Sequence, residues 1–182
     1  MSNKRIVFSG FGGQGILMMG QILAYGAMLE GKEVTFMPSY GPEMRGGTAN
    51  VSTVVSTEPI ASPIVSFPDV LVALNQPSID KFAHSIRPGG VLIYNTNMCP
   101  RGCQREDIIQ IAVPMNEIAS EIGSMIVLNM LATGIIIGKT NIIKYETLEG
   151  NLTSFLKEKN PDLLAKNLAA IQRGIEIGKQ YA

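Results

Sequence analysis

A glycine-rich turn near the start of the chain constrains the fold most. The apolar run from Arg5 to Ser9 has the length of a β-strand, Gly10-Phe11-Gly12-Gly13-Gln14-Gly15 follows it, and a helix-like stretch continues from Ile16 to Leu29. This spacing fits the phosphate-binding pattern G-x-G-x-x-G. Glycine has no Cβ, so a phosphate can approach the backbone and receive hydrogen bonds from free amides at the helix N-terminus. Closely packed turns use the same glycines without a ligand, so alone the motif predicts only a strand, a turn and a helix.

A second glycine-rich segment follows where the next strand, Glu33 to Met37, should end. It reads Pro38-Ser-Tyr-Gly-Pro-Glu-Met-Arg-Gly-Gly-Thr48. Within it, the guanidinium of Arg45 can clasp a carboxylate or phosphate, and the bare amides of Gly46-Gly47 can add donors. Alternatively, Arg45 pairs with Glu43 and only locks the turn.

Strand-length apolar runs alternate with helical stretches along the chain. The expected strands are 5–9, 33–37, 51–56, 70–75, 91–95 and 108–113, and the expected helices are 14–30, 77–86, 116–138, 145–158 and 161–180. This alternation predicts an α/β fold, which we take as a single domain over residues 1–182. Its form is a Rossmann-like, doubly wound, mostly parallel sheet flanked by helices.

Small or polar residues without charge end four of the expected strands. They are Ser9-Gly10, 38–40, 75–77 and 95–97. Ligands of a doubly wound sheet bind beyond the C-terminal ends of its strands, so these residues should share one rim. Polar residues also end strands simply because strands end at the surface, and both interpretations stay open.

Charge and hydropathy narrow the range of partners. Fifteen basic residues balance fifteen acidic ones without long runs of either, so we expect neither nucleic acid nor a membrane as a partner. The most apolar stretch, Met125 to Gly138, is shorter than the roughly 20 residues of a membrane span and predicts a buried helix. Lys4 and Arg5 lead directly into a strand rather than a signal peptide, so we expect a cytoplasmic protein. Only 16% of residues are charged, which indicates a buried subunit interface.

The chain offers little catalytic chemistry of its own. Its second strand ends in Met37-Pro38-Ser39, where a dinucleotide site needs an acid for the ribose, and no Gly-Lys-Ser/Thr follows the first loop. These features disfavour an NAD-dependent reductase and a nucleotide hydrolase. Cys99, Cys103 and the sole histidine, His84, cannot supply four ligands to zinc or an iron–sulfur cluster. We expect reduced thiols on a loop, with a redox pair or an intersubunit ligand as the alternatives, and a packing or surface histidine. No catalytic residue and no metal ligand is assigned.

Together, the two loops resemble the gamma subunit of 2-oxoacid:ferredoxin oxidoreductases. The motifs are Gly-Phe-Gly-Gly-Gln-Gly-Ile at 10–16 and Pro-Ser-Tyr-Gly-Pro-Glu-Met-Arg-Gly-Gly-Thr-Ala at 38–49, and the similarity extends over the whole chain. Such enzymes oxidatively decarboxylate a 2-oxoacid to its acyl-CoA and pass electrons to ferredoxin, using thiamine pyrophosphate and iron–sulfur clusters held mainly by partner subunits. The resemblance implies a subunit that works with alpha, beta and delta partners.

The resemblance further implies that this domain lies near the thiamine site and helps to receive coenzyme A. One set of residues is expected to cradle a phosphate-bearing group of coenzyme A: Gly10, Gly12, Gly13, Gln14 and Gly15. A second set is expected to shape the approach to the thiamine centre: Tyr40, Glu43, Arg45, Gly46, Gly47 and Thr48. Tyr40 is equally open to a role as a subunit contact.

Two questions stay open on the sequence alone. The 2-oxoacid is 2-oxoglutarate, pyruvate or a branched-chain acid, and we favour 2-oxoglutarate or a broad range. The competing function is a stand-alone nucleotide-binding regulatory domain without catalysis, which the same fold permits.

Overall fold

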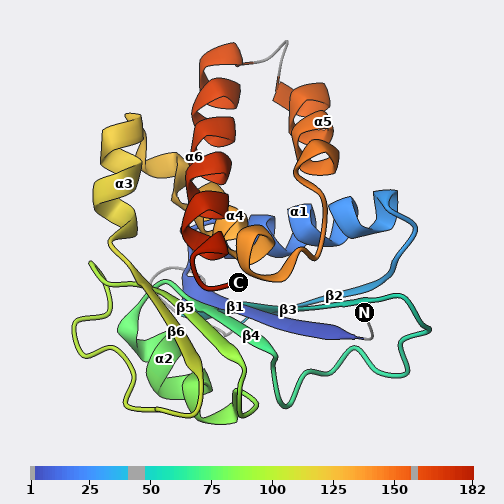
Figure 1. Cartoon of the computed structure of the whole chain (residues 1–182), viewed down its shortest axis with the longest axis vertical. Helices are drawn as coiled ribbons and strands as arrows, with labels where there is room; N and C mark the ends of the chain where they lie inside the picture. The colour runs from blue at the N-terminus through green and yellow to red at the C-terminus, as the bar shows by residue number, and fades with distance from the viewer. Residues whose placement is uncertain (1–2, 41–47, 157–159) are drawn as a thin grey trace.

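The computed structural model describes residues 3–40, 48–156 and 160–182, and it shows one sheet with helices on both faces (Figure 1). The strands are β1 (Lys4–Phe11), β2 (Glu33–Tyr40), β3 (Thr48–Ser56), β4 (Val70–Ala73), β5 (Val91–Asn95) and β6 (Ile109–Val113). They lie in the order β2-β3-β1-β4-β5-β6. β3 runs antiparallel to β1 and to β2, whereas β1, β4, β5 and β6 are parallel neighbours. The expected α/β, mostly parallel fold is confirmed.

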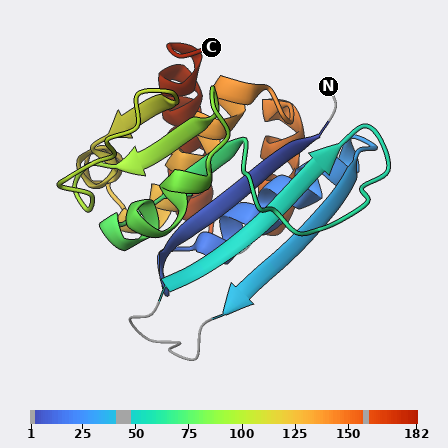
Figure 2. The same cartoon turned by 90° about the horizontal axis from the view of Figure 1, so that it is seen from below.

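The helices divide unequally between the two faces of the sheet. They are α1 (Ile16–Leu29), α2 (Gln76–Phe82), α3 (Met115–Ile122), α4 (Leu128–Thr140), α5 (Tyr145–Leu156) and α6 (Pro161–Lys179). α2 covers one face, and α1 and α4 cover the other, with α5 and α6 standing on that side (Figures 1 and 2). Alternation along β1 serves both cores: Ile6 and Phe8 belong to the larger cluster, and Val7 belongs to the smaller cluster under α2.

Two expected helices are shorter than the sequence indicated. The expected helix over 116–138 is two helices, because Gly123 adopts a left-handed backbone with φ of 92° and ends α3. A 3₁₀ turn, Met125–Val127, then leads into α4. The expected helix over 77–86 ends as α2 at Phe82 and continues as a short 3₁₀ turn, Ala83–Ser85.

α4 and α6 cross with their backbones in direct contact. Each helix carries two glycines four residues apart, Gly134 and Gly138 on α4 and Gly174 and Gly178 on α6. A Cβ added at Gly134 would lie 2.2 Å from the carbonyl oxygen of Ile171. Because backbone oxygen cannot rotate away as a side chain can, only glycine allows this crossing.

The expectation of a buried apolar helix is confirmed by α4. All but one of its residues are buried, and the exception is Lys139. Among the residues that the structure describes, no helix is both long and apolar enough to cross a membrane. The apolar length of α4 therefore serves the core.

Candidate functional site

The first glycine-rich loop is closed by its own glutamine. The Oε1 atom of Gln14 accepts a hydrogen bond of 2.6 Å from the backbone N–H of Phe11, and the N–H of Gln14 donates to the carbonyl of Phe11 at 3.2 Å. The Nε2 atom of Gln14 also lies 3.5 Å from the carbonyl oxygen of Leu74, which follows β4. Gln14 therefore fixes the turn against the neighbouring strand rather than projecting freely toward a ligand.

Two of the loop glycines are required by packing. A Cβ at Gly10 would lie 2.5 Å from Gln14 Oε1 and 3.1 Å from the Cβ of Leu74. A Cβ at Gly15 would lie 2.5 Å from the Nδ2 atom of Asn129 on α4. These two positions fit the interpretation of a closely packed strand-to-helix turn.

Gly13 has a different environment from the two packed glycines. Its φ of 94° favours glycine, and a Cβ there would meet nothing within 4 Å. No described residue accepts a hydrogen bond from the N–H groups of Gly13, Gly15 or Ile16. Free amides at the N-terminus of α1, beside open space, are suited to an anionic group.

The loop lies at the point where the sheet changes its direction of winding. β1 leads into α1 on one face of the sheet, whereas the adjacent strand β4 leads into α2 on the other face. Crevices in doubly wound folds open at such a switch point, beyond the C-terminal ends of the strands. Its position at the switch point distinguishes this loop from an ordinary surface turn.

The second loop starts and ends at the same edge of the sheet. In the ladder between β1 and β3, Phe11 pairs with Thr48, and Gly10 pairs with Ala49, which also pairs with Tyr40 of β2. The backbone of Thr48 therefore lies beside the end of β1, and that of Tyr40 lies one strand further out, across β3. Four residues of the expected site, Glu43, Arg45, Gly46 and Gly47, lie outside the described residues.

The polar residues expected on the rim lie at one edge, but several are buried and bonded within the protein. Asn75 is 1% exposed, and its Oδ1 accepts from both N–H and Oγ of Ser78. Ser9 donates its hydroxyl to Ser78, and Asn95 accepts from the N–H of Met115. These three residues cap helices and join strands, which favours the structural interpretation over ligand binding.

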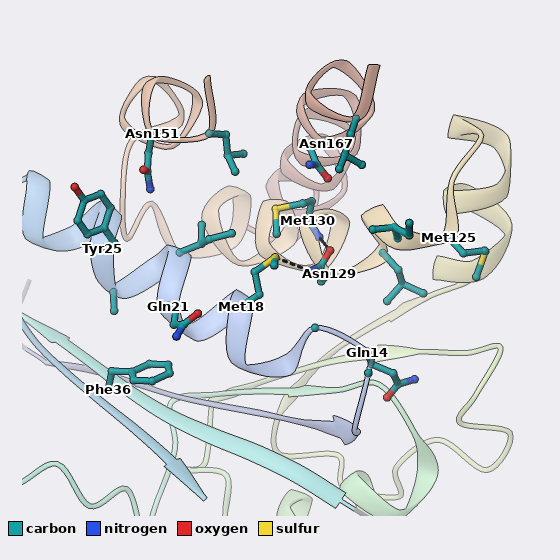
Figure 3. Close-up of a pocket in the computed structure, with 18 of the residues that line it drawn as sticks. Gln14, Met18, Gln21, Tyr25, Phe36, Met125, Asn129, Met130, Asn151 and Asn167 are labelled. Carbon is teal, nitrogen blue, oxygen red and sulfur yellow. Dashed lines mark hydrogen bonds between the residues drawn. The ribbon is translucent and has the colours of Figure 1, made fainter. Parts of the chain in front are cut away.

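A groove of about 1030 Å³ extends from the first loop along α1. Figure 3 shows it between α1 and the helices α4, α5 and α6. Its lining includes Gly13, Gln14 and Gly15 at one end and Tyr25 and Met28 along α1. Among the described residues, no Asp, Glu, Lys, Arg or His lines the groove. The sequence analysis missed it, although the absence of charge from all of α1 was a usable signal.

Carboxamide side chains supply much of the polarity of the groove. Asn129 connects α4 to α1, because its Nδ2 lies 3.4 Å from the sulfur of Met18, while its Oδ1 accepts from the N–H of Met130. Asn151 of α5 and Asn167 of α6 are 9% and 7% exposed, and their amides bond to no described residue. The groove thus offers apolar contact together with two unpaired amides.

The histidine and the cysteines lie outside the groove. His84 is exposed on the 3₁₀ turn after α2. Cys99 is buried under α2, and burial raises the pKa of its thiol to about 12, so it is a poor nucleophile at neutral pH. Cys103 is partly buried, and both thiols are free. Within the described ranges no three His, Cys, Asp or Glu side chains gather into a metal site.

Comparison with protein families gives one match over nearly the whole chain. A family model described as "Pyruvate ferredoxin/flavodoxin oxidoreductase" matches residues 5–177. The 2-oxoglutarate synthase subunit KorC of Methanocaldococcus jannaschii is 38% identical over 97% of this chain and 95% of the relative. The ketoisovalerate oxidoreductase subunit VorA of Methanothermobacter marburgensis is 48% identical over 66% of this chain. The chain spans only 25% of that VorA and 36% of the VorA of Methanothermobacter thermautotrophicus.

Solved structures share the fold. The gamma subunit of a keto/oxoacid ferredoxin oxidoreductase from Geobacter sulfurreducens has a TM-score of 0.86 and 28% identity, over 100% of this chain and 99% of that chain. A 2-oxoglutarate:ferredoxin oxidoreductase from Magnetococcus marinus, with 2-oxoglutarate, coenzyme A and succinyl-CoA bound, has a TM-score of 0.88 and 26% identity. The match covers all of this chain and 32% of that chain. The same domain thus occurs both as a separate subunit and within longer polypeptides.

Proposed function

Because the chain belongs to the pyruvate ferredoxin/flavodoxin oxidoreductase family, we propose that it is the gamma subunit of a multi-subunit 2-oxoacid:ferredoxin oxidoreductase. The observation that carries the proposal is the end-to-end match with the Methanocaldococcus KorC subunit. The assembly converts a 2-oxoacid and coenzyme A to acyl-CoA and carbon dioxide and passes two electrons to ferredoxin. Residues 1–182 form one gamma-type domain in this assembly. 2-Oxoglutarate is the substrate we favour, because the relatives matched over nearly their full length are named 2-oxoglutarate synthase subunits.

The proposed division of labour follows from what the chain contains. It has two cysteines and one histidine, too few for an iron–sulfur cluster, which takes about four ligands. The alpha, beta and delta partners therefore hold the clusters and thiamine pyrophosphate, and ferredoxin accepts electrons from the assembly. This cytoplasmic subunit contributes binding, orientation and the exclusion of water around the cofactor chemistry.

The first loop is suited to a phosphate group of coenzyme A. Gly13 leaves space for the group, and the N–H groups of Gly13, Gly15 and Ile16 are available at the positive end of α1. Gly12 is exposed beside them, and none of the described residues that line the adjoining groove is acidic and would repel an anion. Coenzyme A, when bound, supplies the thiol that accepts the acyl group. The role of the chain is to hold its phosphate end, with Gln14 and Gly10 keeping the turn in shape.

The second loop complements the first in this proposal. Thr48 lies beside the end of β1 and Tyr40 lies across β3 from it, so both ends of the second loop are at the same edge of the sheet as the first loop. Arg45 and the amides of Gly46-Gly47 then supply positive charge and donors toward the approach to the thiamine centre, while Glu43 orients Arg45.

Reconstitution of the complex with Arg45→Ala tests the role of the second loop. We expect the KM for coenzyme A in ferredoxin reduction to rise about tenfold, equivalent to one lost charge-assisted contact of roughly 1.4 kcal/mol. Arg173→Ala on α6 is the matched control, because its guanidinium is exposed and only 3.5 Å from Glu176 in a surface pair. Unchanged kinetic constants for Arg45→Ala would remove this residue from the site.

The mass of the assembly in solution separates this function from a stand-alone regulator. A gamma subunit forms a stable complex with co-expressed alpha and beta subunits, and the isolated chain turns over no 2-oxoacid. A chain that stays monomeric beside those subunits and binds a nucleotide would instead support the regulatory domain.

A further inference from the structure

The outer face of α1 is apolar although it is exposed. The 14 residues of α1 include no charged side chain, and its inner face already packs on the sheet. On the outer face, Met18 is 51% exposed, Tyr25 46%, Met28 59% and Leu29 55%. Helices that are hydrophobic all round are normally covered on all sides. This helix therefore lacks a cover on its outer side.

Four side chains of α1 that line the groove follow the spacing of a helix–helix seam. They are Met18, Ile22, Tyr25 and Met28, separated by four, three and three residues. These spacings place the side chains along one stripe that receives the apolar positions of a helix lying beside it. An extended strand, with a period of two, does not match the stripe.

The groove beside this stripe has the walls that a docked helix needs. Figure 3 shows α1 on one side of the groove and α5 and α6 across from it. Leu152 of α5 and Leu163 of α6 are among the lining residues. Met125 and Ile126, 51% and 73% exposed, continue the apolar surface beyond the N-terminal end of α4. Flexible methionine side chains adapt readily to an incoming apolar face.

The groove also contains polar groups that have no partner in the chain. Asn151 and Asn167 are 9% and 7% exposed, and their amides bond to no described residue. Each amide can both donate and accept a hydrogen bond, and a ligand that covers it without replacing those bonds would lose free energy. One or two polar side chains on an otherwise apolar helix would satisfy them and fix its position.

We propose that the groove formed by α1, α4, α5 and α6 is the docking site for an amphipathic helix of the polypeptide that supplies the rest of the enzyme. The proposal rests on the proposed function. Charge selects the occupant: with no Asp, Glu, Lys, Arg or His among the described lining residues, a charged face would lose its hydration without gaining a partner. In VorA of Methanothermobacter marburgensis the matching region is only a quarter of a longer polypeptide, so in that relative the domain adjoins other parts of the enzyme, and the uncharged groove is suited to such a contact in this chain.

Charge placed on the stripe tests the proposal. Tyr25→Asp and Met28→Asp should each weaken binding of the purified chain to the partner alpha–beta complex by about 30-fold, the loss typical of an interface hot spot. Ile64→Asp is the matched control, since Ile64 is 66% exposed but lies outside the groove, next to Val65, which packs on the α2 side. It should bind within about twofold of wild type. Circular dichroism and thermal unfolding verify that all three variants fold like wild type.

A photo-crosslinker at position 28 identifies the occupant. We expect a cross-linked partner peptide with apolar residues at spacings of three and four and no charge on that face. Cross-links between two copies of this chain, or loss of coenzyme A binding by Tyr25→Asp with assembly intact, would overturn the proposal and assign the groove to a second copy or to the coenzyme. Unchanged binding by both aspartate variants would also overturn it. If wild type itself fails to bind the alpha–beta complex, the proposed function fails instead.

Discussion

The crossing of α4 and α6 and the turn between β1 and α1 use the same residue type in opposite ways. At the crossing, a Cβ on Gly134 would collide with a backbone oxygen at 2.2 Å, so glycine brings two main chains into contact. At the turn, Gly13 has nothing within 4 Å and leaves its N–H free. One arrangement closes space, and the other keeps space open for another molecule.

Glycine spacing alone therefore does not distinguish glycines that packing requires from glycines that are available to bind a ligand. Gly10 and Gly15 belong to the G-x-G-x-x-G pattern, yet neighbouring side chains account for Gly10, and side-chain contact together with φ of 76° accounts for Gly15. The part of the motif that points to a ligand is the exposed Gly12-Gly13 pair.

The largest effect is expected at the closed crossing. Gly134→Ala should lower the free energy of unfolding by about 3 kcal/mol, because a helix backbone must shift to admit the methyl group. Gly150→Ala, in α5, is the matched control: a Cβ there meets nothing within 4 Å, and alanine should be neutral or stabilise the helix by up to about 1 kcal/mol. Urea unfolding measures both. Equal effects at positions 134 and 150 would contradict the crossing.

At the open turn we expect a smaller loss of stability and a loss of binding. Gly13→Ala should cost about 1–2 kcal/mol, since alanine disfavours φ of 94° although space is available. Gly31→Ala is the control, with φ of 73°, equally open space and a position after α1. Both variants should unfold at similar urea concentrations, but only Gly13→Ala should raise the KM for coenzyme A. An equal KM in the two variants would make the turn purely structural.

Loss of the Glu30 carboxylate, which joins the end of α1 to the start of α5, should destabilise the fold less, and the effect should depend on pH. Burial acts to raise the pKa of Glu30, but hydrogen bonds from Lys32, the N–H of Lys144 and Thr147 outweigh it and leave the pKa lowered. A lowered pKa in the folded state means that the stabilisation is present above the unfolded value of 4.5 and is lost as pH falls through the folded pKa. Glu30→Gln should therefore cost about 1 kcal/mol at pH 7.

The pH series decides whether charge is the cause. Urea unfolding of wild type and Glu30→Gln should give free energies that converge as the pH falls below about 4.5. Glu106→Gln, at an exposed glutamate without a hydrogen bond to any described residue, should show little difference at any pH. A constant gap for Glu30→Gln from pH 7 to pH 3 would assign the loss to packing.

The smallest effect is a difference in the rate of alkylation between the two thiols, which requires no substitution and no change in stability. Burial raises the pKa of Cys99 to about 12, whereas Cys103 is only partly buried. Iodoacetamide at pH 8 should alkylate Cys103 first and Cys99 only after unfolding in urea, as read by peptide mass spectrometry. Rapid labelling of Cys99 in the native chain would show that the core under α2 opens.

The sequence predicted the elements well where the pattern is local. All six strands appear close to their expected bounds, because runs such as Val91 to Asn95 are short, apolar and bounded by turn residues. The direction of β3 was not predicted, since an antiparallel neighbour inside a mostly parallel sheet depends on long-range pairing. The break at Gly123 was also missed, because one glycine in a helical pattern is often tolerated.

The site was only partly accessible from the sequence. The loop at Gly10–Gly15 was found because its spacing is a recognised motif, but the roles of Gly10 and Gly15 depend on Leu74 and Asn129, which are distant in sequence. The rim residues Asn75 and Asn95 were candidates for binding in the sequence because their burial and their helix-capping hydrogen bonds depend on the tertiary structure. The groove was not predicted because helices distant in the sequence form it, although the absence of charge from α1 was a signal for an apolar surface.

The central claim is that this chain binds coenzyme A within an enzyme whose reactive cofactors are held by the partner subunits. Coenzyme A-dependent reduction of ferredoxin by 2-oxoglutarate, measured with each subunit omitted in turn, tests it most directly. We expect no turnover by this chain alone, full turnover by the complete complex, and a large loss of coenzyme A-dependent turnover when only this chain is left out. Turnover by the isolated chain, or an unchanged rate without it, would contradict the account.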